Sequence, residues 1–109
     1  MTATEAWEKL VLEGRNQPIS LKTKRGLNFT IISNGEILIV KNSEIEPSCK
    51  LKSSRSIVKE NFEKVFPYYS SWKIGEKGIS KEITAITVNS VYIMAAIDYL
   101  MNIDMLLNN

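Results

Sequence analysis

The dipeptide Asn34-Gly35, set between two segments rich in apolar residues, restricts the possible folds of this chain more than any other feature. Asn-Gly favours the type I′ turn that joins two strands through a two-residue hairpin loop. The flanking runs, residues 28–33 and 36–41, therefore predict a pair of antiparallel strands. The chain is expected to contain a sheet, whatever else it forms.

A third strand is predicted just before this hairpin. Ile19, Leu21 and Thr23 alternate with polar residues, which is the pattern of a half-buried strand over residues 18–24. Together with the hairpin, this strand predicts a three-stranded antiparallel meander. Residues 41–52, which contain Asn, Ser and Pro, predict a connecting loop.

Helices are predicted before and after the meander. Thr2 and Glu5 have the spacing of a capping box, and Gly14 is a natural end for the helix that they begin. After the loop, a serine cluster within residues 53–56 offers an N-cap for a second helix. Pro67 lies inside the helical pattern that follows, and it predicts a kink or a break just before it.

The second and the last helix supply much of the predicted core. The apolar stripe of the second helix steps by three and four residues through Val58, Phe62, Val65, Tyr69 and Trp72. The last helix, expected to begin after Thr87 or Asn89, is apolar nearly all round, as a buried helix is. The predicted fold is α+β, with an N-terminal helix, a three-stranded antiparallel meander, and then two or three helices packed on one face of the sheet. All of it is expected in a single domain over residues 1–109.

The composition excludes several kinds of chemistry. The chain has no histidine, which rules out Ser-His-Asp triads, histidine general bases and HExxH zinc sites. Its one cysteine, Cys49, can form neither an internal disulfide nor a cysteine-rich zinc site. The acidic residues are scattered and form no recognisable catalytic pattern. We therefore expect a non-enzymatic protein with no metal and no cofactor.

The sequence predicts neither a targeting signal nor a membrane span. The N-terminus lacks a basic segment followed by an apolar run, so no signal peptide is expected. The longest apolar run, residues 91–97, is far shorter than the roughly 20 residues that a membrane-spanning helix needs. We expect a soluble protein of the cytoplasm that makes no membrane contact.

Positive charge is concentrated in two blocks, although the net charge is only +2. Residues 15–26 and residues 48–59 each contain four Lys or Arg side chains and no acidic one. Such cations, with hydroxyl and amide groups nearby, are suited to the phosphates of nucleic acid. The residues predicted to neutralise phosphates are Lys22, Lys24, Arg25, Lys50, Lys52 and Arg55. This hypothesis requires the two blocks to share one surface; the alternative is ordinary solvated charge, including lysines that protect a sheet edge.

Two further features bear on binding. Tyr68, in an aromatic run flanked by lysines, is the predicted stacking platform for a base, while its aromatic neighbours are expected in the core. The expected helix entry at residues 53–55 would add backbone N–H groups, which bind anions. An alternative interpretation of the same residues is therefore a small-molecule or anion-binding module at this helix entry.

The predicted element order resembles that of the double-stranded RNA-binding domain over roughly residues 3–70. That family has a lysine-rich patch at the start of its second helix, and Lys50, Lys52 and Arg55 match this location. The alanine-rich continuation of the family is replaced here by Ser-Ile-Val-Lys, and its proline and histidine between the first two strands are missing. The resemblance implies an element order and assigns no functional residue.

Residues 55–93 are also similar to stretches of small bacterial and phage proteins, and we expect a protein of this kind that contacts nucleic acid. The alternative is a homo-oligomeric protein that binds or inhibits a partner protein through apolar helix surface. Met94, Met101 and Met105 are adaptable apolar contacts on the predicted last helix. This alternative predicts a homodimer through the helix from Ser90 to Leu107.

Overall fold

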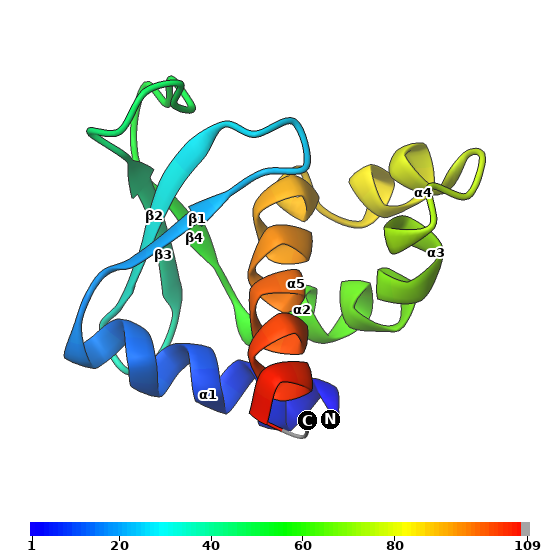
Figure 1. Ribbon diagram of the computed structural model, residues 1–109, viewed down its shortest axis with the longest axis horizontal. Helices are drawn as coiled ribbons and strands as arrows, with labels where there is room; N and C mark the ends of the chain where they lie inside the picture. The colour runs from blue at the N-terminus through cyan, green and yellow to red at the C-terminus, as the bar shows by residue number, and fades with distance from the viewer. Residues whose placement is uncertain (108–109) are drawn as a thin grey trace.

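The computed structural model describes residues 1–107 and confirms an α+β fold, with an antiparallel sheet packed against a group of helices (Figure 1). The elements along the chain are α1 (Ala3–Asn16), β1 (Ile19–Lys22), β2 (Asn28–Ser33), β3 (Leu38–Asn42), β4 (Arg55–Ile57), α2 (Lys59–Val65), the 3-10 turn η1 (Phe66–Tyr68), α3 (Tyr69–Lys73), α4 (Ile79–Ile86) and α5 (Ser90–Leu107). Figure 1 shows α5 between the sheet on one side and α3 and α4 on the other, with α1 below the sheet.

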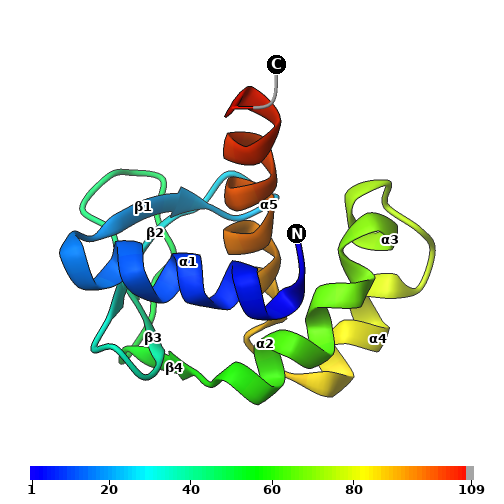
Figure 2. The ribbon, with the colours of Figure 1, turned by 90° about the horizontal axis from the view of Figure 1, so that it is seen from below.

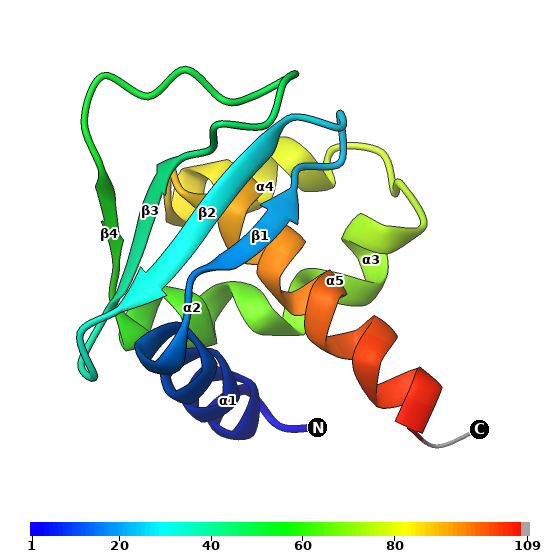
Figure 3. The same cartoon turned by 60° about the vertical axis from the view of Figure 1, so that its left-hand side comes forward.

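The sheet is an antiparallel meander in the order β1-β2-β3-β4, so it has one strand more than predicted. Its inward face is apolar, and each of these side chains is at most 6% exposed: Ile19, Leu21, Phe29, Ile31, Leu38, Val40 and Ile57. The strand register places Ser20, Thr30 and Lys41 side by side on the opposite face. Figure 3 shows that face turned away from α5. One face of the sheet therefore forms the core, as the alternating pattern predicts.

The predicted hairpin is present, but its loop is longer than the Asn-Gly dipeptide predicts. Ser33 pairs with Leu38, which leaves four residues in the loop. Asn34 Oδ1 accepts hydrogen bonds from two backbone N–H groups later in the loop, at 2.9 and 3.1 Å. In this loop only Gly35 has a positive φ, of 98°, whereas a type I′ turn needs two such residues. The side chain of Asn34 thus closes a wider turn than the predicted one.

β4 corrects the prediction that the second helix begins at the serine cluster. Residues 55–57 form this strand, and α2 begins only at Lys59. β4 pairs with β3, and Ile57 lies opposite Leu38 with both side chains buried. Without β4, the outer edge of β3 would keep a row of unpaired N–H and C=O groups. Arg55 therefore lies on a strand, whereas Lys50 and Lys52 lie in the loop between β3 and β4. The element order departs here from that of the double-stranded RNA-binding domain.

α1 begins as predicted but does not end at Gly14. The Thr2 hydroxyl accepts a hydrogen bond from the Glu5 N–H at 3.1 Å and caps the helix. Gly14 is buried within the helix, and a Cβ at this position would lie 3.1 Å from the backbone nitrogen of Ser33. Glycine is needed here for the close approach of α1 to β2, and the helix continues to Asn16.

The helices after the sheet follow the predicted pattern. The predicted break at Pro67 is confirmed, because η1 separates α2 from α3 at this proline. α5 starts directly after Asn89, and its central part forms the middle of the core. Its fully buried apolar side chains, at 0% exposure, are Ile93, Met94, Ala96 and Ile97. Figure 2 shows that the C-terminal end of α5 projects beyond the other elements.

Within residues 1–107, no single helix has both the length and the apolar character needed to cross a membrane. The consecutive segments Ile79–Ile86 and Ser90–Leu106 reach that threshold only as a pair, and they are bent by 107° at the break between them.

Gly14→Val is expected to lower the free energy of unfolding by roughly 1–3 kcal/mol, because the added side chain would push α1 away from β2. Urea unfolding followed by tryptophan fluorescence measures this change. Lys9→Val, at an exposed position of the same helix, is the control for the helix propensity of valine. Equal midpoints for the two variants would show that the stability does not depend on this close approach.

Candidate functional site

A pocket of about 530 Å³ lies where the turn between β1 and β2, the strand β4, the helices α3 and α4, and the start of α5 meet. Three cations line it, Lys24 and Arg25 from the turn and Arg55 from β4. The other residues that line this pocket are Thr23, Leu27, Cys49, Trp72, Ser80, Val88, Val91 and Tyr92. No acidic residue is among the described residues of this lining. The pocket thus joins cations from both basic blocks.

Hydrogen bonds within the β1–β2 turn hold Lys24 and Arg25 at its tip. The Thr23 N–H donates to the Leu27 carbonyl oxygen at 2.9 Å, and the Thr23 hydroxyl accepts from the Leu27 N–H at 3.2 Å. Gly26 supplies a positive φ of 88°, which other residues rarely adopt. The turn therefore presents both cations from a backbone that is closed by its own hydrogen bonds.

The register of the sheet brings Arg55 to the same pocket. Arg55 pairs with Val40, a residue of the buried face, so its side chain leaves the sheet on the side of the helices. The guanidinium donates to Asn89 Oδ1 at 3.4 Å and lies 5.9 Å from the centre of the Tyr92 ring. The Asn89 amide also donates to the Ser56 carbonyl oxygen at 3.3 Å, which ties the start of α5 to β4.

Two of the three cations lie over aromatic rings. Lys24 Nζ is 4.7 Å from the centre of the Trp72 ring and donates to the Trp72 carbonyl oxygen at 2.7 Å. The Arg55 guanidinium lies over Tyr92 in the same way. A ring attracts a cation through its quadrupole but carries no net charge. Both side chains are therefore positioned while their positive charge stays available to an anion.

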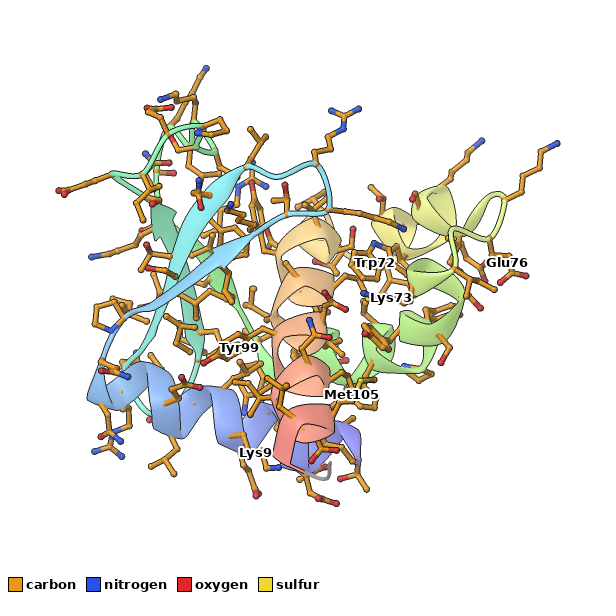
Figure 4. All side chains as sticks on the ribbon, in the orientation of Figure 1. Lys9, Trp72, Lys73, Glu76, Tyr99 and Met105 are labelled. Atoms are coloured by element: carbon orange, nitrogen blue, oxygen red, sulfur yellow. The ribbon has the colours of Figure 1, made fainter. Side chains whose placement is uncertain are left out.

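A smaller hollow of about 320 Å³ adjoins the pocket and shares Lys24 and Trp72 with it. Lys22, Lys73 and Asp98 also line this hollow. Figure 4 shows Trp72 and Lys73 between α3 and α5. The hollow extends the cationic surface from the pocket along β1 and α5.

The carboxylate of Asp98 is compensated by its neighbours. Lys73 Nζ lies 2.9 Å from Asp98 Oδ1, and the Tyr69 hydroxyl donates to the same oxygen at 2.6 Å. Burial favours the neutral acid, but the hydrogen bonds from Tyr69 and Lys73 and the charge of Lys73 outweigh it, so the pKa of Asp98 is below its ordinary value of 3.8. Burial and the adjacent carboxylate raise the pKa of Tyr69. Asp98 is therefore ionised at neutral pH, with its charge offset by Lys73.

The other predicted contacts lie outside the larger pocket. Lys22 lines only the adjoining hollow. Lys50 is ion-paired with Glu46 at 2.7 Å, and the hydrogen bond from Lys50 lowers the pKa of Glu46. Lys52 is exposed within the loop between β3 and β4, and Tyr68 is half-buried against the core. The structure thus brings three of the seven predicted residues together in the pocket.

The sequence did not identify the two aromatic residues of the pocket. Trp72 belongs to the helical stripe assigned to the core, and at 8% exposure it is a core residue that also borders the pocket. Tyr92 lies in the apolar last helix, where its ring makes an edge-to-face contact with Phe29. Burial raises the pKa of the Tyr92 hydroxyl. Helical spacing does not distinguish a core ring from a ring beside a cavity, so no sequence signal was available.

The predicted anion site at a helix entry over residues 53–55 is wrong. Arg55 belongs to β4, and α2 follows after Val58, which makes no side-chain capping hydrogen bond. Serine is frequent at helix N-caps, but here residues 55–57 pair with β3, and Ser53 and Ser54 lie in the loop before this strand. No helix N-terminus therefore lies at these serines to bind an anion.

In the described part of the chain, no group of three or more His, Cys, Asp and Glu side chains is placed to hold a metal ion. Comparison with known proteins gives no family: no family model, no curated protein and no solved structure matches this chain. The function is therefore inferred from the pocket and its surroundings.

Asp98→Asn is expected to reduce the free energy of unfolding at pH 7 by about 1 kcal/mol, because Lys73 and Tyr69 lose a charged acceptor. The folded-state pKa of Asp98 is lowered, so its stabilisation is present above the unfolded-state pKa and is lost as the pH falls through the folded-state value. The difference between the proteins should therefore vanish in strong acid, which urea unfolding at several pH values measures. Glu60→Gln, which breaks the more exposed pair with Lys64, is the control and should change little. A loss that is independent of pH would contradict this assignment.

Proposed function

We propose that this chain is a small non-enzymatic bacterial or phage protein of the cytoplasm that contacts nucleic acid through the cationic pocket. The observation that carries the proposal is that Lys24, Arg25 and Arg55, from two blocks far apart in the chain, line one pocket without an acidic residue in its described lining. Phosphate groups are the part of a nucleic acid that such a surface binds, whatever the base sequence.

The adjoining hollow supports contact with more than one phosphate. Lys22 lines it, and the pocket and the hollow have Lys24 in common; Lys73 also lines the hollow but is ion-paired with Asp98. A single strand that follows this surface would meet cations at successive positions, with aromatic side chains beside them. Lys52 and Tyr68 remain proposed flanking contacts, whereas Lys50 is paired with Glu46 and is no longer proposed as a phosphate contact.

The titratable groups of the pocket favour binding over catalysis. Burial raises the pKa of the Cys49 thiol, which keeps it protonated and weakly nucleophilic at neutral pH. The Tyr92 hydroxyl, whose pKa burial also raises, likewise keeps its proton at neutral pH. The chain has no histidine, so the described lining of the pocket lacks the side chain that most often exchanges protons near pH 7.

Arg25→Ala/Arg55→Ala is expected to weaken binding to fluorescently labelled single-stranded and duplex oligonucleotides at least about tenfold at low salt, since each lost cation removes a phosphate contact. Fluorescence anisotropy at several salt concentrations also gives the slope of log K against log[salt]. The double variant should reduce this slope by roughly 1.4 on single strands and 1.8 on duplex.

The matched control is Lys50→Ala/Lys64→Ala, which removes the same charge from two side chains that are already ion-paired to Glu46 and Glu60. This control should bind nearly as well as the unchanged protein. Equal losses in both double variants would mean that net charge alone drives the binding. Absence of binding at 50 mM salt would refute the proposed function.

A second candidate function is self-association through the end of α5. Met105 and Leu106 are 64% and 76% exposed on the segment that projects from the molecule (Figure 2). Met94, in contrast, is fully buried and offers no contact to a partner, and Met101 is half-buried. The side chain of Leu107 lies outside the described part of the chain. The partner surface in this candidate is therefore confined to the last turns of the helix.

Sedimentation equilibrium tests this candidate, which predicts a mass above the 12.4 kDa of one chain. Met105→Glu/Leu106→Glu should return the mass to that of a monomer, because like charges would face each other across a homodimer contact. Ile74→Glu, at another exposed apolar position, is the control. A monomer at every protein concentration would refute the homodimer.

A further inference from the structure

We infer that the cationic pocket binds a single nucleotide bearing a phosphate monoester, either as a free mononucleotide or as the phosphorylated end of a strand. This inference rests on the proposed function and specifies which part of the nucleic acid enters the pocket. Three observations support it: the charge of the pocket, its apolar lining, and the contact between Lys24 and Trp72 at its border.

The cations of the pocket match a doubly charged group. Lys24, Arg25 and Arg55 all border the same cavity. A phosphate monoester carries about −1.5 to −2 charges at pH 7, whereas a phosphodiester within a strand carries a single charge. Guanidinium groups bind phosphate oxygens through two parallel hydrogen bonds. Two arginines and a lysine are therefore better matched to a terminal phosphate than to an internal one.

The remaining lining is suited to a base and a sugar. Leu27, Val88, Val91 and the Tyr92 ring supply apolar and aromatic surface beside the cations. Val88 and Val91 are 71% and 49% exposed, so this surface is open to a ligand. Bases stack on such surfaces with little dependence on their identity. The cavity, about 530 Å³, lies within the range of roughly 300–1,000 Å³ that is usual for small-ligand sites.

The contact between Lys24 and Trp72 separates the pocket from the smaller hollow. Both residues border both cavities, and the ammonium donates to the Trp72 carbonyl oxygen at 2.7 Å. At this distance no nucleotide fits between them. An internal nucleotide of a strand that follows both cavities has to pass over this contact, whereas a terminal nucleotide enters the pocket and leaves the contact intact.

Isothermal titration calorimetry of the intact protein tests the inference with inorganic phosphate, a nucleoside, the corresponding nucleoside 5′-monophosphate, and short strands that end in either a phosphate or a hydroxyl. The monophosphate is expected to bind at least about tenfold more tightly than the nucleoside or inorganic phosphate, because only it uses both the cations and the apolar lining. A strand phosphorylated at its 5′ or its 3′ end should exceed the hydroxyl-ended strand by a similar factor.

Two pairs of variants connect these preferences to the pocket. Arg25→Ala/Arg55→Ala should abolish them, and Lys50→Ala/Lys64→Ala should retain them. Val91→Asp places a carboxylate in the exposed pocket lining and should also abolish monophosphate binding. Val58→Asp, at a similarly exposed valine outside this lining, should leave it unchanged. The comparison of Val91→Asp with Val58→Asp keeps the test decisive if loss of Arg55 unfolds the protein.

The outcomes distinguish this inference from the proposed function. If both kinds of strand bind equally and mononucleotides do not, the inference fails while nucleic-acid contact stands. If the mononucleotide binds through the pocket but no strand does, the inference holds for a free nucleotide and nucleic-acid contact fails. If inorganic phosphate binds as tightly as the monophosphate, the pocket is a simple anion site and the inference fails.

Discussion

The burial of α5 is the interaction on which the rest of the structure depends. This helix contacts β1 on one side and α1, α2, α3 and α4 on others, and Figure 1 shows it at the centre of the molecule. Its side chains at Ile93, Met94 and Ile97 are fully buried. Each buried side chain of this size contributes roughly 1.5–3 kcal/mol. Because one helix serves both the sheet and the helical half, the two halves cannot separate without exposing it.

The pocket is a consequence of this arrangement. Around the first turn of α5 the β1–β2 turn, β4 and the helices α3 and α4 converge, and their side chains leave about 530 Å³ unfilled. Two of the three cations that border this space, Lys24 and Arg55, are positioned by aromatic rings and by backbone and amide oxygens. None of these partners cancels a positive charge, so the site is preorganised for an anion at no cost in ion-pair disruption. In contrast, Lys50 and Lys64 have carboxylates as partners.

Local signals predicted the elements that local physics determines. The capping hydroxyl of Thr2, the hairpin around Asn34 and the break at Pro67 each depend on residues a few positions apart, and each is present. The misassigned features depend on distant partners. Gly14 resembles a helix end because glycine is usual there, but β2 lies against it, and residues 55–57 resemble a helix start until β3 pairs with them. Helix propensity depends on residues within one or two helical turns. Strand pairing and the close packing of a helix on a strand depend on chain segments that meet only on folding.

The sequence by itself determined the α+β class, the apolar last helix, the two basic blocks and the absence of histidine chemistry, because composition and periodicity are properties of single segments. Only the tertiary structure decided which cations meet. It brought Arg55 to Lys24 and Arg25 through the register of β4 and left Lys50 with Glu46. The physical reason is geometric, because a strand directs alternate side chains to opposite faces of the sheet. The face on which a cation lies therefore depends on the strand register, which no local sequence pattern encodes.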